Sequence, residues 1–552
     1  MGTGMAGGRD GGGGTVRGAV VEALRGLGMA TVFGNPGSTE IPFLGEWPNS
    51  LRYVLGLQEA SVVAMADGYA RASGRAAFCN LHSAAGVGHA LGNLFTAYRN
   101  NAPLVVTAGQ QARALLPHQP FLGATDAAQF PKPYVKWSVE PARAEDVPAA
   151  IAQAWRIAMQ RPRGPAFVSI PVDDWARPAA PVVPRPALSD PAPDPDALAE
   201  LAAALAASRR PVLVVGPEAD EEGAGPAAVA LAERLNAPAW ASPFASRLCF
   251  PEDHRLFAGH LAAAPDAVGH ALAGHDLVLV LGAPVFTFHV AGDCALFDGA
   301  TPLWHLTTDA EAAARSPVGR GVLGSLRLGL PALLPLLPEA HGRADPPPRV
   351  RAPAPAAADP LPADFVMARL AALLPPGAVV VEEAPSHRPA MHAHLPFREW
   401  GSFLTMASGG LGYALPAAVG VALARADAGS GARVVCLIGD GSLMYSVQAL
   451  WTAAQHRLPL SVVVLNNRGY GAMRSFSRVM GVRSVPGIEL PGLDFTAIAR
   501  GHGCAAERVE RPGALDDALA RALSADGPAL LDVAVDTAAA RLYREAGEED
   551  VR

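Results

Sequence analysis

An aspartate and an asparagine in the last quarter of the chain follow two apolar runs and could together bind a metal ion. The first run, Val434 to Ile438, has the pattern of a buried strand and leads into Gly439-Asp440-Gly441. The second run, Leu460 to Leu465, leads into Asn466-Asn467. The pattern predicts two parallel strands whose carboxyl ends meet at one edge of a sheet, where open α/β sheets bind ligands.

The Asp440 carboxylate, the Asn467 amide oxygen and a nearby backbone carbonyl are hard oxygen ligands suited to Mg2+ or Ca2+. The remaining coordination positions would suit diphosphate oxygens. Gly441 and Ser442 can offer N–H and O–H groups to the same phosphates, ahead of a helix expected from about Tyr445 to His456. An ordinary strand-turn-helix unit is the alternative for Gly-Asp-Gly alone, and the second strand-end asparagine argues against it.

Three polar residues follow predicted strands in the first third of the chain. Ser38 closes the turn-forming run Gly34-Asn-Pro-Gly-Ser38, Glu59 opens a helix, and His82 follows the buried run Ala76 to Leu81. This is the distribution expected of a site at the carboxyl edge of a sheet. Each residue also has a structural alternative: a turn hydroxyl, a carboxylate that complements a helix dipole, and a histidine without chemistry.

The chain is too long for one hydrophobic core, at 552 residues. Its alternation of strand and helix patterns predicts α/β domains, and Pro- and Ala-rich stretches at about 176–197 and 344–362 predict linkers. We expect a disordered glycine-rich tail and three domains, with these boundaries: 1–14, 15–178, 190–345 and 360–540.

Charge and composition exclude several classes of protein. A net charge of −7 without a basic stripe argues against a nucleic-acid partner, and no apolar run has membrane length. The glycine-rich start lacks the apolar core of a signal peptide. The five cysteines have no C-x-x-C spacing, which predicts reduced, buried thiols in a cytoplasmic protein.

Several motifs taken together resemble the benzoylformate decarboxylases, thiamine-diphosphate-dependent enzymes that act on 2-oxo acids. The likeness runs from about Val16 to Leu531, and it rests on Gly34-Asn-Pro-Gly-Ser38, Gln58-Glu59-Ala60, Leu81-His-Ser-Ala-Ala-Gly86, Gly109-Gln-Gln111, Ala283-Pro-Val-Phe286, Gly409-Gly-Leu-Gly412 and Gly439-Asp-Gly-Ser442.

The resemblance implies three doubly wound parallel-sheet domains: pyrimidine-binding, middle and diphosphate-binding. It also implies that the cofactor bridges the first domain of one subunit and the third of another. We therefore expect a homo-oligomer, at least a dimer and commonly a tetramer.

The same resemblance assigns roles to individual residues. Glu59 matches the carboxylate that activates the cofactor's aminopyrimidine, and Ser38 matches the serine that binds the substrate carboxylate. His82 and His289 match two histidines that relay protons, in the pKa range suited to this task. Metal binding falls to Asp440, Asn467 and the Gly469 carbonyl, and cofactor binding to Ser386, Gly409, Leu411, Gly441, Ser442 and Tyr470.

The chain departs from the family pattern near the diphosphate and in the substrate pocket. Pro385 replaces a phosphate-side hydroxyl, and Thr405 stands where an aromatic side chain is expected. Phe121 could restore some aromatic surface. The other expected wall residues are Ala472, Met473 and Phe476, so the aryl pocket is expected to be reshaped.

The predicted reaction is non-oxidative decarboxylation of an aryl 2-oxo acid, with benzoylformate giving benzaldehyde and CO2. One alternative keeps the cofactor but joins the intermediate to a second carbonyl, as acetolactate synthases do, and another is decarboxylation of a different 2-oxo acid. A non-catalytic, cofactor-binding paralogue is a third reading. It would be expected to lose Glu59 or a metal ligand, and this chain has both.

Overall fold

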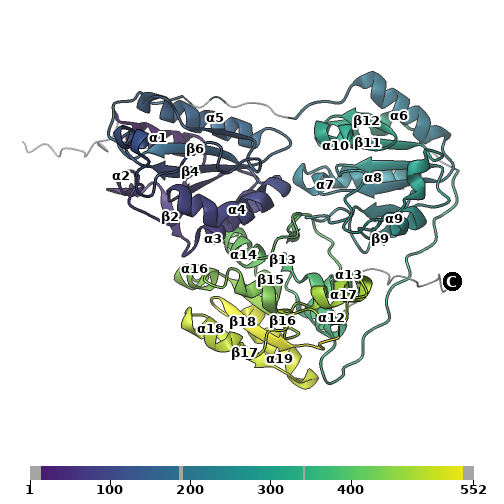
Figure 1. Cartoon of the computed structure of the whole chain (residues 1–552). Coiled ribbons are helices and arrows are strands. Elements are labelled where there is room, and N and C mark those ends of the chain that lie inside the picture. Colours follow the sequence, from purple (N-terminus) through teal and green to yellow (C-terminus); the bar gives the residue numbers. More distant parts are fainter. Residues whose placement is uncertain (1–13, 184, 186–189, 340–341, 539–541, 543–552) are drawn as a thin grey trace, which may run out of the picture. The chain divides into compact units, whose positions relative to one another are not determined.

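The computed structural model describes residues 14–183, 185, 190–339, 342–538 and 542. These residues form three six-stranded sheets, each flanked by helices (Figure 1). Paired strands run parallel throughout, which confirms the predicted fold class. Of the predicted tail over 1–14, all but Gly14 lies outside the described residues.

The first sheet has the strand order β2-β1-β3-β4-β6-β5. Because the chain leaves β1 and β3 in opposite directions across the sheet, the crevice where such folds bind ligands lies between these two strands. The strands are β1 Thr31–Gly34, β2 Arg52–Leu55, β3 Ala77–Leu81, β4 Leu104–Gln110, β5 Trp137–Val139 and β6 Ala166–Pro171. The helices are α1 Val16–Gly26, α2 Ile41–Leu44, α3 Glu59–Ser73, α4 Ser83–Arg99 and α5 Val147–Met159.

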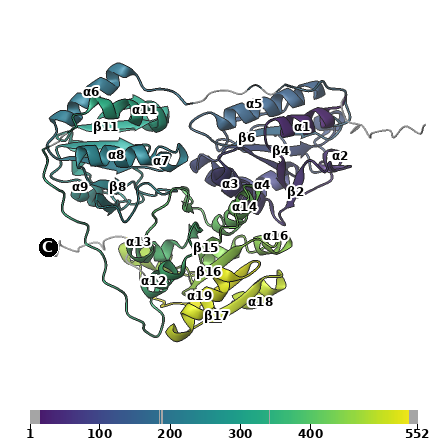
Figure 2. The same cartoon turned by 180° about the vertical axis from the view of Figure 1, so that it is seen from behind.

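The second sheet has the order β12-β11-β10-β7-β8-β9 and is buried on both faces. In β7, Leu213 and Val215 pack into one core cluster, and Val212 and Val214 pack into another on the opposite face. Its strands are β7 Pro211–Val215, β8 Ala239–Ala241, β9 Phe257–His260, β10 Leu277–Leu281, β11 Leu303–Thr307 and β12 Arg320–Leu323. The helices of this domain are α6 Pro195–Ala207, α7 Glu218–Glu221, α8 Gly225–Leu235, α9 Pro265–Ala271, α10 Ala310–Ala314 and α11 Leu326–Leu333. Helices α6 and α11 lie side by side (Figure 2).

The third sheet has the order β14-β13-β15-β16-β18-β17, with its crevice between β13 and β15. The strands are β13 Val379–Glu383, β14 Phe403–Thr405, β15 Val434–Gly439, β16 Leu460–Asn466, β17 Ala505–Val509 and β18 Ala529–Ala534. The helices are α12 Ala363–Leu373, α13 Arg388–His394, α14 Ala414–Asp427, α15 Asp440–Met444, α16 Ala449–Gln455, α17 Gly471–Val479, α18 Phe495–Gly501 and α19 Leu515–Ser524.

The helix predicted from about Tyr445 to His456 is confirmed over part of this range, as α16 Ala449–Gln455. The residues Tyr445 to Gln448 separate it from the short helix α15, which ends at Met444. The Ser446 N–H donates to the Leu443 carbonyl at 3.3 Å, three residues earlier, so the chain forms a 3₁₀-type turn here in place of an α-helical turn. Serine and valine in this segment favour helices only weakly.

The chain divides into two compact units, of which one holds the first sheet and the other holds the second and third sheets. Within the second unit, hydrogen bonds join its two sheet domains. The Asp220 carboxylate accepts from the Gly401 N–H at 2.7 Å and pairs with Arg247 at 3.1 Å. The Thr405 N–H donates to the Ser246 carbonyl at 3.0 Å. These contacts hold β14 against the middle domain.

The five cysteines are all buried and unpaired, as predicted. No helix among the described residues has the length and apolarity needed to cross a bilayer. The second and third sheets fall within the predicted ranges 190–345 and 360–540, and the domain boundaries themselves remain predictions.

Arg433 stabilises the third domain from a buried position next to β15. Its guanidinium donates to the Ser461 hydroxyl at 2.7 Å and to the carbonyls of Ala522 and Ala525 at 2.6 Å each. Arg433→Met would remove the side-chain donor from the Ala525 carbonyl and from the Ser461 hydroxyl oxygen, while the Ala522 carbonyl keeps the Ser461 hydroxyl as a donor. We expect it to lower the free energy of unfolding by about 3 kcal/mol, measured as a shift in calorimetric melting. The exposed ion pair of Arg521 supplies the control: Arg521→Met should cost less than about 1 kcal/mol.

Candidate functional site

Asp440 joins the two strand-end loops that the sequence singled out. Strands β15 and β16 pair in parallel with Gly439 opposite Leu465, so Asp440 and Asn467 follow at the same edge. The Asp440 carboxylate accepts hydrogen bonds from the N–H groups of Gly441 at 2.8 Å and Gly469 at 2.9 Å. Burial raises the pKa of Asp440 to about 6. A buried carboxylate of this kind is stabilised by a bound cation.

Asn467 contributes an oxygen that has no protein partner. Its Oδ1 is buried without a hydrogen bond among the described residues, while its Nδ2 lies 3.4 Å from His387 Nε2. Burial lowers the pKa of His387 to about 4, so this imidazole is neutral at pH 7. The Gly469 carbonyl accepts one hydrogen bond, from Gly471 at 3.0 Å, which leaves a second lone pair. These oxygens fit a divalent metal ion.

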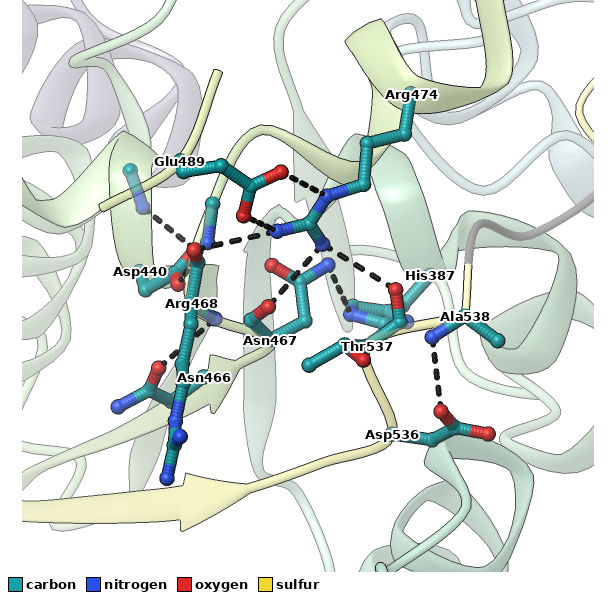
Figure 3. Close-up of polar contacts among 12 residues, drawn as sticks. His387, Asp440, Asn466, Asn467, Arg468, Arg474, Glu489, Asp536, Thr537 and Ala538 are labelled. Carbon is teal, nitrogen blue, oxygen red and sulfur yellow. Dashed lines mark hydrogen bonds and ion pairs between the residues drawn. The ribbon is translucent and has the colours of Figure 1, made fainter. Parts of the chain in front are cut away.

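Arg474 fixes the loop that carries two of these ligands (Figure 3). Its guanidinium donates to the backbone carbonyls of Asn467 and Arg468, each at 3.2 Å, and pairs with Glu489. The sequence analysis missed this residue. Its position in the first turns of the helix after Asn467, close to the loop, is the signal that was available.

Every predicted site residue of the second unit lines one cavity of about 860 Å³. Glycine is required where Gly441 meets Tyr470, because a Cβ there would lie 2.5 Å from the tyrosine ring. The predicted residues that share the cavity are His289, Ser386, Thr405, Gly409, Leu411, Asp440, Gly441, Ser442, Asn467, Gly469, Tyr470, Ala472, Met473 and Phe476.

Glu383 anchors the loop that contains Gly409 and Leu411. Its buried carboxylate accepts from the N–H groups of Gly412, Tyr413 and Ala414, each at 2.7 Å, where α14 begins. Burial raises the pKa of Glu383 to about 7, while the three N–H groups favour its ionised form. The Glu383 carboxylate therefore fixes the loop that lines the cavity through Gly409 and Leu411.

Two aromatic rings contact His289, which lines the same cavity. The His289 ring lies edge-on to Phe476, with ring centroids 4.8 Å apart, and to Phe244 at 5.8 Å. Met473 also lines this wall. The cavity thus combines a place for a metal-bound diphosphate with an apolar surface that carries an imidazole.

The first unit brings its three predicted residues to the carboxyl edge of its sheet. Ser38 lies after β1, Glu59 begins α3, and His82 lies between β3 and α4. The Ser38 side chain is exposed, whereas Glu59 is buried and accepts from Asn35 Nδ2 at 3.2 Å and pairs with His89 at 3.1 Å. Phe121 is 87 % exposed in this unit, so its place in a substrate wall remains a prediction.

Glu40 is a functional candidate that the sequence analysis missed. Its carboxylate lies 2.8 Å from His82 Nδ1, and it accepts from the N–H groups of Gly37 and Gly109 at 3.0 Å each. The Thr39 hydroxyl donates to it at 2.7 Å. Four donors therefore fix this buried carboxylate and, through it, the imidazole ring. A carboxylate two residues after Ser38, in the same strand-end loop, was the available signal.

Comparisons with known proteins agree with this geometry. Models of thiamine pyrophosphate enzymes match residues 14–130 (N-terminal TPP binding domain), 198–333 (central domain) and 384–533 (C-terminal TPP binding domain). The chain is 46 % identical to benzoylformate decarboxylase of Pseudomonas aeruginosa, over 95 % of this chain and 99 % of the relative. The chain belongs to the benzoylformate decarboxylase family of thiamine diphosphate enzymes.

Solved structures support the same family. The crystal structure of benzoylformate decarboxylase from Polynucleobacter necessarius superposes with a TM-score of 0.92 at 40 % identity, covering 95 % of this chain and 99 % of that one. The Rhodococcus jostii 4-hydroxybenzoylformate decarboxylase gives 0.90 at 40 % identity with the same coverage. Thiamine diphosphate and a divalent metal are the cofactors of this family, and the oxygens of Asp440 and Asn467 fit them.

The unpartnered Asn467 oxygen gives a direct test of metal binding. Asn467→Leu keeps the shape of the side chain and removes that oxygen, so we expect the affinity for thiamine diphosphate with Mg2+ to fall at least about tenfold. Isothermal titration calorimetry measures the change. The control is Ser477→Ala, on the same helix as Arg474, which should bind thiamine diphosphate and Mg2+ as tightly as the unchanged protein. If Asn467→Leu bound them equally tightly, Asn467 would not be a metal ligand.

Proposed function

We propose that the protein decarboxylates an aryl 2-oxo acid without oxidation, with benzoylformate as the first candidate and benzaldehyde and CO2 as products. The observation that carries the proposal is the shared cavity, in which the cofactor-binding residues meet an aromatic wall bearing His289. The relatives named benzoylformate decarboxylase support the substrate class. Two histidines able to deliver protons favour release of an aldehyde over ligation to a second carbonyl.

Asp440, Asn467 and the Gly469 carbonyl would hold the metal, which we take to be Mg2+. Ser386, Gly441, Ser442 and Tyr470 would surround the diphosphate, and Gly409 and Leu411 would contact the rest of the cofactor. Bound thiamine diphosphate supplies an acceptor for the electron pair that CO2 leaves behind, a task that no side chain can perform.

The residues of the chain position the substrate and move protons. Glu59, oriented by Asn35 and His89, would hold a proton beside the aminopyrimidine ring of the bound cofactor. Ser38 donates its hydroxyl to the substrate carboxylate. His82 and His289 supply protons to the ketone oxygen and to the carbon that has lost CO2.

The assembly and location of the protein are part of the same proposal. Family members share the cofactor between subunits, so the working enzyme is a homodimer or homotetramer. A cytoplasmic location accords with the five buried, unpaired thiols. Light scattering at catalytic concentration tests the oligomer, and a catalytically active monomer would contradict it.

The activity is tested by incubating the protein with thiamine diphosphate, Mg2+ and a panel of 2-oxo acids, with CO2 and aldehyde measured. We expect turnover of benzoylformate to benzaldehyde. Turnover of pyruvate to acetolactate with none of benzoylformate would overturn the proposal. Glu59→Gln should abolish turnover without unfolding the protein, and retained turnover would remove Glu59 from its role.

Glu40 should act through His82. Glu40→Gln replaces an acceptor with an amide N–H that cannot accept from both Gly37 and His82, so the imidazole loses its fixed orientation. We expect turnover to fall by about 100-fold with unchanged cofactor affinity. In a His82→Gln background the same change should have little further effect, since the two residues act as one. Glu46→Gln, at an exposed glutamate, is the control and should leave turnover unchanged. If the losses of turnover from Glu40→Gln and His82→Gln simply multiply in the double variant, Glu40 does not act through His82.

A further inference from the structure

Phe244 lines the cavity from a tight turn that follows β8. The Ala245 N–H donates to the Ser242 carbonyl at 3.3 Å, which closes the turn over Pro243 and Phe244. The φ angle of Phe244 is 53°, in the left-handed region where turns of this kind usually place glycine or asparagine. Phenylalanine therefore gives the turn no conformational benefit, and residues held in such conformations cluster at functional sites.

Hydrogen bonds fix the chain on both sides of this turn. Before it, the Ser242 N–H donates to the Val215 carbonyl at the end of β7, at 2.9 Å. After it, the Ser246 carbonyl accepts from the Thr405 N–H of β14, at 3.0 Å. The surrounding structure thus holds the backbone of Phe244 in its left-handed conformation and keeps the side chain at the cavity.

The Phe244 ring is part of the aromatic wall around His289. The His289 ring lies edge-on to Phe244, with centroids 5.8 Å apart and an interplanar angle of 67°. It lies edge-on to Phe476 as well, at 4.8 Å and 66°. Because the proposed function assigns a proton transfer to His289, the substrate group attached to the reacting carbon would lie near these two rings.

The side chain at position 405, where the family pattern expects an aromatic ring, is committed to polar contacts. The Thr405 hydroxyl donates to Glu382 Oε2 at 2.8 Å, and the same oxygen accepts from Arg388 at 2.8 Å. The hydrogen bond from the Thr405 N–H to the Ser246 carbonyl places the turn of Phe244 directly beside this position. The aromatic ring that is absent at position 405 is therefore present on the neighbouring turn, two residues before Ser246.

We propose that Phe244 is a specificity-determining residue, whose ring contacts the aryl group of the 2-oxo acid and selects it over a saturated group of the same size. Aromatic rings that meet edge-to-face or offset attract each other beyond the effect of burying their surfaces. A saturated ring lacks the charge distribution for this attraction. The inference rests on the proposed function and names the residue that sets its preference for aryl substrates.

The test compares two 2-oxo acids that each carry a six-membered carbon ring. Benzoylformate has an aromatic ring, and cyclohexylglyoxylate has a saturated ring of similar size. Because their intrinsic reactivities differ, the measured quantity is the ratio of kcat/KM for benzoylformate to that for cyclohexylglyoxylate, compared between the unchanged protein and each variant. Phe244→Leu keeps an apolar side chain but removes the aromatic ring, so we expect the ratio to fall by about three- to tenfold.

A second variant and a control complete the experiment. Phe244→Gly removes the whole side chain, and glycine accepts a φ of 53° without strain, so this variant should fold even where Phe244→Leu does not. It should lower the ratio at least as far. Phe365→Leu is the matched control, because Phe365 is half-buried on α12 and is not among the described residues that line the cavity. It should leave the ratio unchanged.

The outcomes separate this inference from the proposed function. If Phe244→Leu and Phe244→Gly lower kcat/KM for both substrates by the same factor, the ring acts through His289 and does not select the substrate, which overturns the inference. An unchanged kcat/KM for both substrates overturns it equally. If the unchanged protein, loaded with thiamine diphosphate and Mg2+, turns over no aryl 2-oxo acid, the proposed function is overturned together with the inference.

Discussion

The parallel pairing of β15 with β16 is the constraint on which the cofactor-binding region depends. It brings Asp440 and Asn467 to one edge, where the Asp440 carboxylate bonds backbone N–H groups of both strand-end loops. The same register leaves the Asn467 oxygen buried without a partner in the part of the chain that the structure describes. Two buried oxygens at one edge are costly in an empty site and favourable around a cation, so the fold itself creates the affinity.

Buried carboxylates hold the functional loops in both units. Asp440, Glu383 and Glu40 each accept at least two backbone N–H groups from residues at or just after strand ends. Neighbouring residues of a strand face opposite sides, so Glu383 holds the Gly412 loop while Glu382 turns toward Arg388. A carboxylate buried in a low-dielectric interior needs such donors. Because it binds several N–H groups at once, it also restricts the backbone around it to one arrangement.

The sequence predicted the features that depend on local pattern. Apolar runs ending in polar residues located the sheets, and the strand-end positions of Asp440, Asn467 and His82 marked them as candidate site residues. The helix expected over Tyr445–His456 begins only at Ala449, after a tight turn at Ser446. Glu40 was missed because its importance lies in a long-range contact with His82 that spacing along the chain does not reveal.

The run that contains Gly37 was correctly predicted to form a turn, but conformational freedom is only part of the reason for a glycine there. The run from Gly34 to Ser38 indicated a tight turn, in which glycine provides conformational freedom. In the structure a Cβ on Gly37 would lie 2.0 Å from His82 Nδ1. Glycine is therefore required for space, because any side chain would displace the imidazole from Glu40. The turn, the histidine and the buried carboxylate form one unit, and a substitution at Gly37 would act on His82 without contacting the substrate.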